Sequence, residues 1–336
     1  MMYLSLDKIL DVGRKVDPII IRTLSANTPS TFLPSIRYPF QAGGKRMRAA
    51  LVILCCAAGG GRMKDALRPA AAVEMIHNYS LVMDDLIDRG VLRRGKPTTR
   101  VVFGDSTSLL VAMYYREALD EIIQKSIPSS RIREVAVMAM KDIIDGERLD
   151  LLFEQAGREE PYLNRNRLRN PNFQQYLRMI GKKTAALFRA ASEVGGLAAG
   201  ADNGIVEKLR EFGWKSGLAF QIMDDVLDIV GDETGKQRGK DIVEHKLGNA
   251  AILMAIRYLS QTKRRELLNI LRSENASHAM VTKAIRIVAK TPAEAACREV
   301  AGAYLEDAKR KLLGLKASSY RLSLLSLCDL IVARKF

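Results

Sequence analysis

The sequence contains little tryptophan, proline, cysteine and histidine, and each shortage narrows the possibilities. With one tryptophan and ten prolines among 336 residues, an architecture of strands and tight turns has little support. The three histidines and four cysteines form no persuasive Cys-His or Ser-His-Asp arrangement. Because no C-x-x-C pair occurs, we expect neither disulfides nor a zinc site at Cys55, Cys56, Cys297 and Cys328.

Long apolar runs are absent too. Stretches such as 49–58 and 190–199 are rich in alanine and too short to span a bilayer, so the sequence predicts no transmembrane helix. Residues 1–7 lack the basic stretch and the long apolar stretch of a secretory signal, and we therefore expect a cytoplasmic protein. With 48% hydrophobic and 27% charged residues, the composition is that of a globular chain.

Acidic residues are in the minority. The chain has 38 Asp and Glu against 53 Lys and Arg, which gives a formal net charge of +15. Such a surplus fits nucleic-acid binding, a solvated basic surface or the binding of anionic phosphates. The position of the charges has to decide among the three.

Helical periodicity dominates what is present, which favours an all-α fold. Residues 157–171, polar and rich in Asn and Arg, suggest an extended loop. No segment has the composition of a flexible linker, so we predict a single-domain helical bundle over residues 1–336. Apolar or small residues recur every three or four positions in two long stretches, as in amphipathic helices: Val73, Ile76, Ser80, Met83 and Ile87, then Val206, Leu209, Phe212, Leu218 and Ile222.

Two acidic clusters of the same form, Asp-Asp-x-x-Asp, lie within apolar stretches of this basic chain. On a helix, the first and last Asp of each cluster project from one face, about one turn apart. Carboxylates gathered in this way repel one another, so a cluster against an apolar wall requires a cation. Oxygen ligands favour Mg²⁺, which binds through a few carboxylates together with substrate phosphates. The residues are Asp84, Asp85 and Asp88 in the first cluster and Asp224, Asp225 and Asp228 in the second.

Basic residues accompany both clusters. His77 precedes Asp84 by seven residues and so lies on nearly the same helical stripe, although a lone histidine is as often a structural residue. Arg93 and Arg94 suit bidentate contacts with diphosphate oxygens. The turn 43–48 has two glycines that allow close approach to a phosphate, yet alone it could be an ordinary basic turn. Further cations are Lys183 beside Thr184, the run 235–241 and Lys246.

With these motifs in this order, residues 43–246 resemble the trans-type isoprenyl diphosphate synthases, and most of all the archaeal-type geranylgeranyl diphosphate synthases. The resemblance implies an all-α bundle of the isoprenoid synthase type around a deep central cavity, a homodimer and Mg²⁺ as cofactor. It also implies the reaction, in which isopentenyl diphosphate is joined head to tail to an allylic diphosphate and inorganic diphosphate is released. It implies no nucleic acid and no transmembrane segment.

The same resemblance implies roles for individual residues. The Mg²⁺ ligands would be Asp84, Asp88 and Asp224, supported by Asp85, Asp225 and Asp228. The allylic diphosphate would contact Arg93, Lys183 and Lys246, and Lys236 would be a further substrate-binding residue. The isopentenyl diphosphate would contact Gly44, Lys45, Arg48, His77 and Arg94. The reaction centre would be lined by Thr184 and Gln221, with Asp150 in support.

The residues below the first cluster bear on product length. Tyr79, Ser80 and Ile76 form a pattern similar to that of the archaeal-type geranylgeranyl diphosphate synthases, with farnesyl and longer products as alternatives. Tyr79 could also simply pack between helices. The chain departs from the common family pattern at His245 and 248–250, around Lys246, which concerns substrate preference more than reaction class.

Three rival interpretations fit less well. A terpene cyclase ionises the same kind of substrate, but it normally replaces the second Asp-rich cluster and needs no isopentenyl contacts. A non-catalytic subunit of a prenyl synthase tends to lose the acidic ligands. A nucleic-acid-binding helical protein would explain the positive charge but not the six clustered aspartates. We therefore interpret the chain as a Mg²⁺-dependent prenyltransferase.

Overall fold

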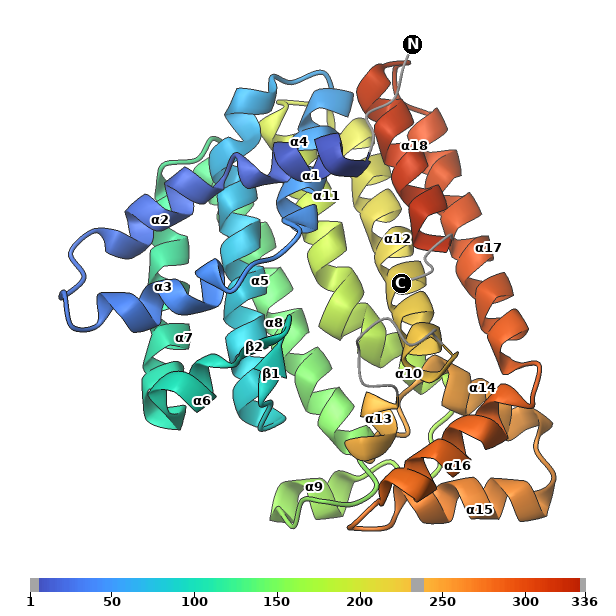
Figure 1. Ribbon diagram of the computed structural model, residues 1–336. Coiled ribbons are helices and arrows are strands. Elements are labelled where there is room, and N and C mark those ends of the chain that lie inside the picture. The colour runs from blue at the N-terminus through green and yellow to red at the C-terminus, as the bar shows by residue number, and fades with distance from the viewer. Residues whose placement is uncertain (1–5, 231–238, 333–336) are drawn as a thin grey trace. The chain divides into compact units, whose positions relative to one another are not determined.

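The computed structural model describes residues 6–230 and 239–332, and most of them lie in helices (Figure 1). The described chain divides into two compact units. The first contains 6–141, 187–213 and 309–327; the second contains 142–186, 214–230, 239–308 and 328–332. The all-α prediction is confirmed. One domain over 1–336 stays a prediction.

The first unit is built around α5 (Leu67–Ile87), the helix that carries the first acidic cluster. α5 packs against α4 (Met47–Ala58) and α7 (Asp105–Gln124). Small side chains such as Ala70 and Ala71 are fully buried on α5 and allow close packing of its neighbours. The shorter elements of this unit are α1 (Leu6–Arg14), α2 (Asp17–Ser25), α3 (Leu33–Gln41), the 3₁₀ turn η1 (Met63–Ala66) and α6 (Thr99–Phe103).

A small hairpin follows α5 and consists of β1 (Leu92–Arg93) and β2 (Lys96–Pro97). The strands are antiparallel, with Arg93 opposite Lys96. The turn residues Arg94 and Gly95 have φ values of 56° and 74°, the left-handed conformation that a tight two-residue hairpin turn requires. This turn folds the chain back on itself directly after the first acidic cluster.

The second unit carries the second acidic cluster, near the C-terminal end of α12 (Asn203–Val230). Local sequence sets several of its helix starts, since Asn172, Asn249, Ser260 and Ser277 each accept a hydrogen bond from a backbone N–H of the helix that follows. Its short elements are α9 (Pro161–Asn166), α10 (Phe173–Ile180), the π-helical turn η2 (Gly181–Ala185), α13 (Lys240–Val243), α14 (Ala250–Tyr258), α15 (Gln261–Leu271) and α16 (His278–Ala289).

Several longer helices contribute residues to both units. They are α8 (Ser129–Phe153), α11 (Ala186–Ala198), α12 (Asn203–Val230), α17 (Ala293–Leu313) and α18 (Ser319–Val332). The periodic residues predicted to face the core from α12 are all buried there: Val206, Leu209, Phe212, Leu218 and Ile222.

One prediction on secondary structure is wrong in part. The segment 157–171 was expected to be an extended loop, but α9 occupies its centre and begins at Pro161, a residue that favours the first turn of a helix. The expectation on membrane spans agrees with the structure, because none of the helices among the described residues is both long and apolar enough to cross a bilayer.

Candidate functional site

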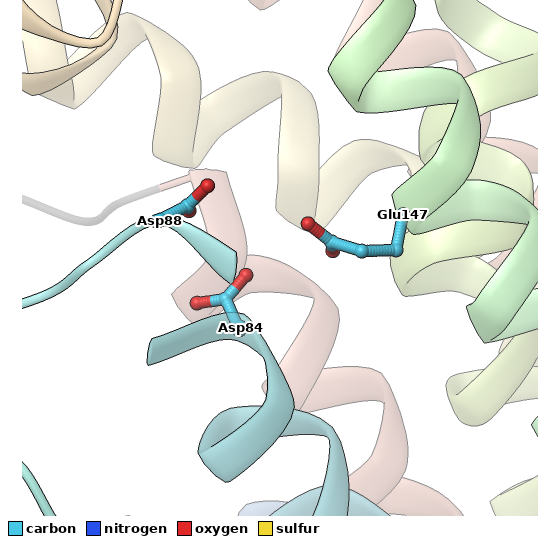
Figure 2. A group of neighbouring side chains, drawn as sticks. All are labelled: Asp84, Asp88 and Glu147. Atoms are coloured by element: carbon cyan, nitrogen blue, oxygen red, sulfur yellow. The ribbon is translucent and has the colours of Figure 1, made fainter. Parts of the chain in front are cut away.

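The first acidic cluster lies at the C-terminal end of α5. Asp84 is in the last turn of the helix, and the backbone N–H of Asp88 donates to the Asp84 carbonyl at 2.8 Å. Each of the two side chains offers a carboxylate oxygen, and these oxygens lie within 4.8 Å of one another. Figure 2 shows Asp84 and Asp88 at this helix end; Glu147, which is also labelled there, belongs to the second unit and is described with it below. Oxygen donors at the negative end of a helix dipole suit a hard divalent cation.

Arg93, on the hairpin, holds two of the three carboxylates of this cluster. Its Nε donates to both carboxylate oxygens of Asp85 at 2.9 Å, and its Nη2 donates to Asp84 at 2.6 Å. Burial acts to lower the pKa of the Arg93 guanidinium, but the hydrogen bonds and charges of Asp85 and Asp84 outweigh it and raise that pKa. The Asp85 side chain, which accepts twice from Arg93, therefore anchors the hairpin to α5, whereas Asp84 and Asp88 are the members of the cluster whose oxygens lie close enough together for a metal.

A cationic group faces the middle of α5 from α4. The guanidinium of Arg48 lies 3.0 Å from Nε2 of His77 and stands over the ring of Phe188 at 5.2 Å. Burial lowers the pKa of His77 well below its usual 6.5, and the positive charges of Arg48, Arg94 and other arginines lower it further. His77 is therefore a neutral imidazole at pH 7, able to accept a hydrogen bond from Arg48 and to orient it.

The Gly43-Gly44 turn brings more positive charge to the same unit. Arg94, on the hairpin, donates to the carbonyl of Gly43. Gly44 has φ +142°, and a Cβ placed there would come within 2.6 Å of Nη1 of Arg94, so this close approach requires glycine. Lys45 is exposed on the turn. The turn, the hairpin and α4 thus supply three cations: Lys45, Arg48 and Arg94.

Arg46 has a different place from its neighbours, and the sequence did not reveal it. Its side chain is only 5% exposed, its φ is +52°, and its Nε donates to Asp17 at 2.9 Å. Its other nitrogens lie 3.7 Å from Glu74 on α5 and donate to the carbonyls of Phe40 and Gly43. Arg46 therefore ties the turn to α5 from inside the unit.

The residues expected to set product length lie further down α5. Ile76 is 1% exposed, and Ser80 donates its hydroxyl to the His77 carbonyl at 2.8 Å. Tyr79 is half-buried, and burial raises its pKa while the charge of Arg116 on α7 acts to lower it. The phenol of Tyr79 is thus on the side of α5 that packs against α7.

In the second unit, Asp150 on α8 holds two of the predicted lysines. It accepts from Lys183 at 2.6 Å and lies 3.0 Å from the amino group of Lys246. Burial acts to raise the pKa of Asp150, but the two lysine charges prevail and lower it to about 2. Lys183 also pairs with Glu147 at 2.8 Å, a residue the sequence analysis missed although it precedes Asp150 by three positions on the same helix face.

Asp225 is the buried member of the second cluster. Its carboxylate accepts from the Tyr176 hydroxyl at 2.6 Å, from the Gln221 amide at 2.8 Å and from the backbone of Ala250 at 3.0 Å. Gln221 accepts in turn from the hydroxyl of Thr184 at 2.7 Å. This chain of hydrogen bonds connects η2 and α12, so Asp225 holds the local structure together.

The other two members of that cluster differ in exposure. Asp224 is exposed, whereas Asp228 accepts from the backbone N–H groups of Lys240 and Asp241 at 3.0 and 3.2 Å. Burial and the nearby Asp241 raise the pKa of Asp228 to about 7, and burial raises that of Asp241 to about 6 against the opposing charge of Lys246. Neighbouring carboxylates that are shielded from water can all be ionised only if positive charge is nearby. A bound divalent cation would supply that charge.

The predicted site residues thus form two sets, each within one unit. Lys236 lies outside the described residues. The first unit contains Gly44, Lys45, Arg48, Ile76, His77, Tyr79, Ser80, Asp84, Asp85, Asp88, Arg93 and Arg94. The second contains Asp150, Lys183, Thr184, Gln221, Asp224, Asp225, Asp228 and Lys246.

Known proteins resemble this chain in sequence and in architecture. The polyprenyl synthetase family model matches residues 29–288. A geranylgeranyl diphosphate synthase from Methanosarcina mazei is 30% identical over 100% of both chains. The crystal structure of a decaprenyl diphosphate synthase from Rhodobacter capsulatus has a TM-score of 0.87 at 28% identity, covering 99% of this chain and 100% of its own. A polyprenyl synthase from Caulobacter crescentus CB15, complexed with calcium and isoprenyl diphosphate, has a TM-score of 0.87 at 28% identity, covering 99% and 98%.

Proposed function

Because the chain belongs to the polyprenyl synthetase family and is a prenyltransferase, we propose that it joins isopentenyl diphosphate head to tail to an allylic diphosphate. The product is geranylgeranyl diphosphate, and inorganic diphosphate is released. The full-length relative from Methanosarcina mazei, which is named for that product, supports this choice. The similar decaprenyl diphosphate synthase makes a longer product the alternative.

The pair of carboxylates at the end of α5 carries the proposal. Asp84 and Asp88 offer oxygens within 4.8 Å of one another, and these are the hard donors that Mg²⁺ prefers. Asp224 is the exposed acid of the second cluster. In the proposal these three residues ligate Mg²⁺, while Asp85 and Asp225 keep their hydrogen-bond partners and hold the backbone of each cluster.

Ionisation of an allylic diphosphate separates a carbocation from a highly charged leaving group. Bound Mg²⁺ would supply positive charge to the departing oxygens. Lys183 and Lys246 contribute fixed cations to the same task, and their shared partner Asp150 holds both amino groups in place. Arg93 adds a third cation. Lys236 is a further substrate-binding residue, and Thr184 and Gln221 line the reaction centre.

The homoallylic substrate binds to the other cationic set. Lys45, Arg48 and Arg94 contact the diphosphate of isopentenyl diphosphate, and the Gly44 backbone approaches it closely. Because His77 is neutral, it accepts from Arg48 and leaves that guanidinium fully charged. The double bond of this substrate then attacks the allylic cation, and the new cation loses a proton to the released diphosphate, so no side-chain nucleophile is needed. Water must be excluded, since it would quench the cation.

Product length is set below the first cluster. Tyr79 limits how far the growing chain extends along α5, and Ser80 is small enough to leave room above it. Ile76 lies deeper on the helix. The half-buried position of Tyr79 on the α7 side supports a role as the floor of the space for the product.

The protein acts as a homodimer in the cytoplasm. A row of large apolar side chains on α7 supports the dimer: Leu109 is 47% exposed, Leu110 54% and Met113 58%. A second copy of the chain would cover them and remove their apolar surface from water. Light scattering should give twice the chain mass for the wild type and a single chain mass for Met113→Glu with Leu110→Glu.

The test of the proposed function is an elongation assay. The protein is incubated with Mg²⁺, labelled isopentenyl diphosphate and dimethylallyl, geranyl or farnesyl diphosphate in turn, and the products are sized. We expect geranylgeranyl diphosphate, no product in EDTA, and a loss of about 100-fold in Asp84→Asn. Asp11→Asn, at an exposed acid of α1, is the matched control and should keep its activity. Absence of elongation with every primer would refute the proposal.

A further inference from the structure

Asn249 is more than a helix cap. Its Oδ1 accepts from the backbone N–H of Ile252 at 3.1 Å, which is the usual N-cap contact and starts α14. The side chain is, however, completely buried, with 0% exposure. A buried amide that used only its oxygen would leave two N–H donors without water and would destabilise the fold.

The two remaining donors connect the second acidic cluster to Asp241. Nδ2 of Asn249 donates to the carbonyl of Asp225 at 3.1 Å and to a carboxylate oxygen of Asp241 at 2.8 Å. Asp225 belongs to α12 and Asp241 to α13, and all of these residues are in the second unit. One side chain therefore fixes three helices to one another at the place where the cluster lies.

Asp241 is in turn connected to Asp228 of that cluster and to Lys246. Its backbone N–H donates to Asp228 at 3.2 Å, and its carbonyl accepts from the backbone N–H of Lys246 at 2.7 Å. Holding the Asp241 carboxylate thus helps to fix the described residues 241–246. Buried carboxylates repel one another, and a neutral amide donor offsets part of that repulsion without adding a charge that would compete with a cation.

We propose that Asn249 is a positioning residue, whose amide holds the Asp241 carboxylate and the Asp225 backbone so that the second acidic cluster keeps the arrangement that binds Mg²⁺ with diphosphate. This role rests on the proposed function for its purpose, but it can be measured without the reaction. It goes beyond the cap, because a cap uses the oxygen of Asn249 alone.

Asn249→Ser separates the two roles. Serine is as good an N-cap as asparagine, so the start of α14 is kept while both amide donors are lost. We expect the variant to fold with an unfolding temperature lowered by only a few degrees, because two buried acceptors lose their donor while the cap is kept. We also expect Mg²⁺ affinity, measured by calorimetric titration in the presence of inorganic diphosphate, to fall about tenfold, since loss of a residue that orients metal ligands commonly has this effect. The Mg²⁺ concentration for half-maximal elongation should rise by the same factor.

A double variant shows whether Asn249 acts through Asp241. Asp241→Asn alone should weaken Mg²⁺ binding, and adding Asn249→Ser to it should change the affinity less than twofold, because coupled residues are not additive. Asn172→Ser is the matched control, since Asn172 caps α10 at an exposed position. It should leave Mg²⁺ binding unchanged.

Every outcome of these experiments either supports or overturns the positioning role of Asn249. A Mg²⁺ affinity of Asn249→Ser within twofold of the wild type overturns the proposal, and so do additive effects in the double variant. Loss of folding in Asn249→Ser also overturns it, because Asn249 would then be a structural residue only. Asn249→Asp keeps the cap but puts a carboxylate beside Asp241, so it should weaken binding further. If the wild type binds Mg²⁺ with diphosphate but elongates nothing, the proposed function fails while the positioning role stands.

Discussion

Replacement of Arg46 by methionine should destabilise the protein strongly. Methionine keeps much of the side-chain stem but removes a guanidinium that is 5% exposed and lies 3.7 Å from Glu74, itself 2% exposed. Removing one partner of a buried ion pair leaves an uncompensated charge and typically costs about 3 to 5 kcal/mol. The carbonyls of Phe40 and Gly43 also lose a donor. The Asp17 pair adds less, because Asp17 is 33% exposed and solvent screens it.

The assay is denaturant unfolding followed by helical circular dichroism. We expect the free energy of unfolding of Arg46→Met to fall by about 3 to 5 kcal/mol. Adding Glu74→Met should recover part of the loss, since the buried charge is then gone as well. Arg14→Met is the control, because the Arg14 pair with Asp11 is exposed and should be worth less than about 1 kcal/mol. An Arg46→Met variant as stable as this control, or a double variant no more stable than Arg46→Met, would refute the reasoning.

Three further predictions concern other parts of the two units. Tyr79→Ala should lengthen the product in the elongation assay, and an unchanged product distribution would discard Tyr79 as the floor. Because the folded-state pKa of His77 is lowered, the unfolded chain takes up a proton at His77 before the native protein does as the pH falls below about 6.5. Stability should therefore drop from pH 7.5 to pH 5.5, and the drop should be smaller in His77→Asn; equal drops in urea unfolding would contradict this. In Gly146→Ala, the new Cβ would lie 2.2 Å from the backbone nitrogen of Lys183, so η2 must shift. The free energy of unfolding should therefore fall by about 1 to 3 kcal/mol, and prenyl transfer should slow. Wild-type stability and rate in that variant would show that η2 does not depend on Gly146.

The long helices could be predicted because their pattern is long. The periodic residues of α12 repeat over several turns, and each of them is buried as expected. α9 was missed because six residues, Pro161–Asn166, are too few to show a period, and the polar composition around them is that of a loop. Its start at a proline was the available signal.

The sequence predicts which types of residue form the site, but not which residues form hydrogen bonds or ion pairs with one another. The sequence identified Asp225 as acidic, yet only the fold shows that Tyr176, Gln221 and Ala250 satisfy it. In the same way, Arg46 reads as one more cation of a basic turn, but it is buried against Glu74. Residues that face a ligand and residues that hold others in place have the same chemistry in the sequence, and burial separates them.

The most direct test of the central claim is a measurement of diphosphate release against isopentenyl incorporation in the same reaction. If both acidic clusters serve Mg²⁺-dependent prenyl transfer, the wild type should release one diphosphate for each isopentenyl unit added, and only with Mg²⁺ and both substrates. Asp84→Asn and Asp224→Asn should each lose release and incorporation together, by about 100-fold. Wild-type release and incorporation in either variant would contradict the account.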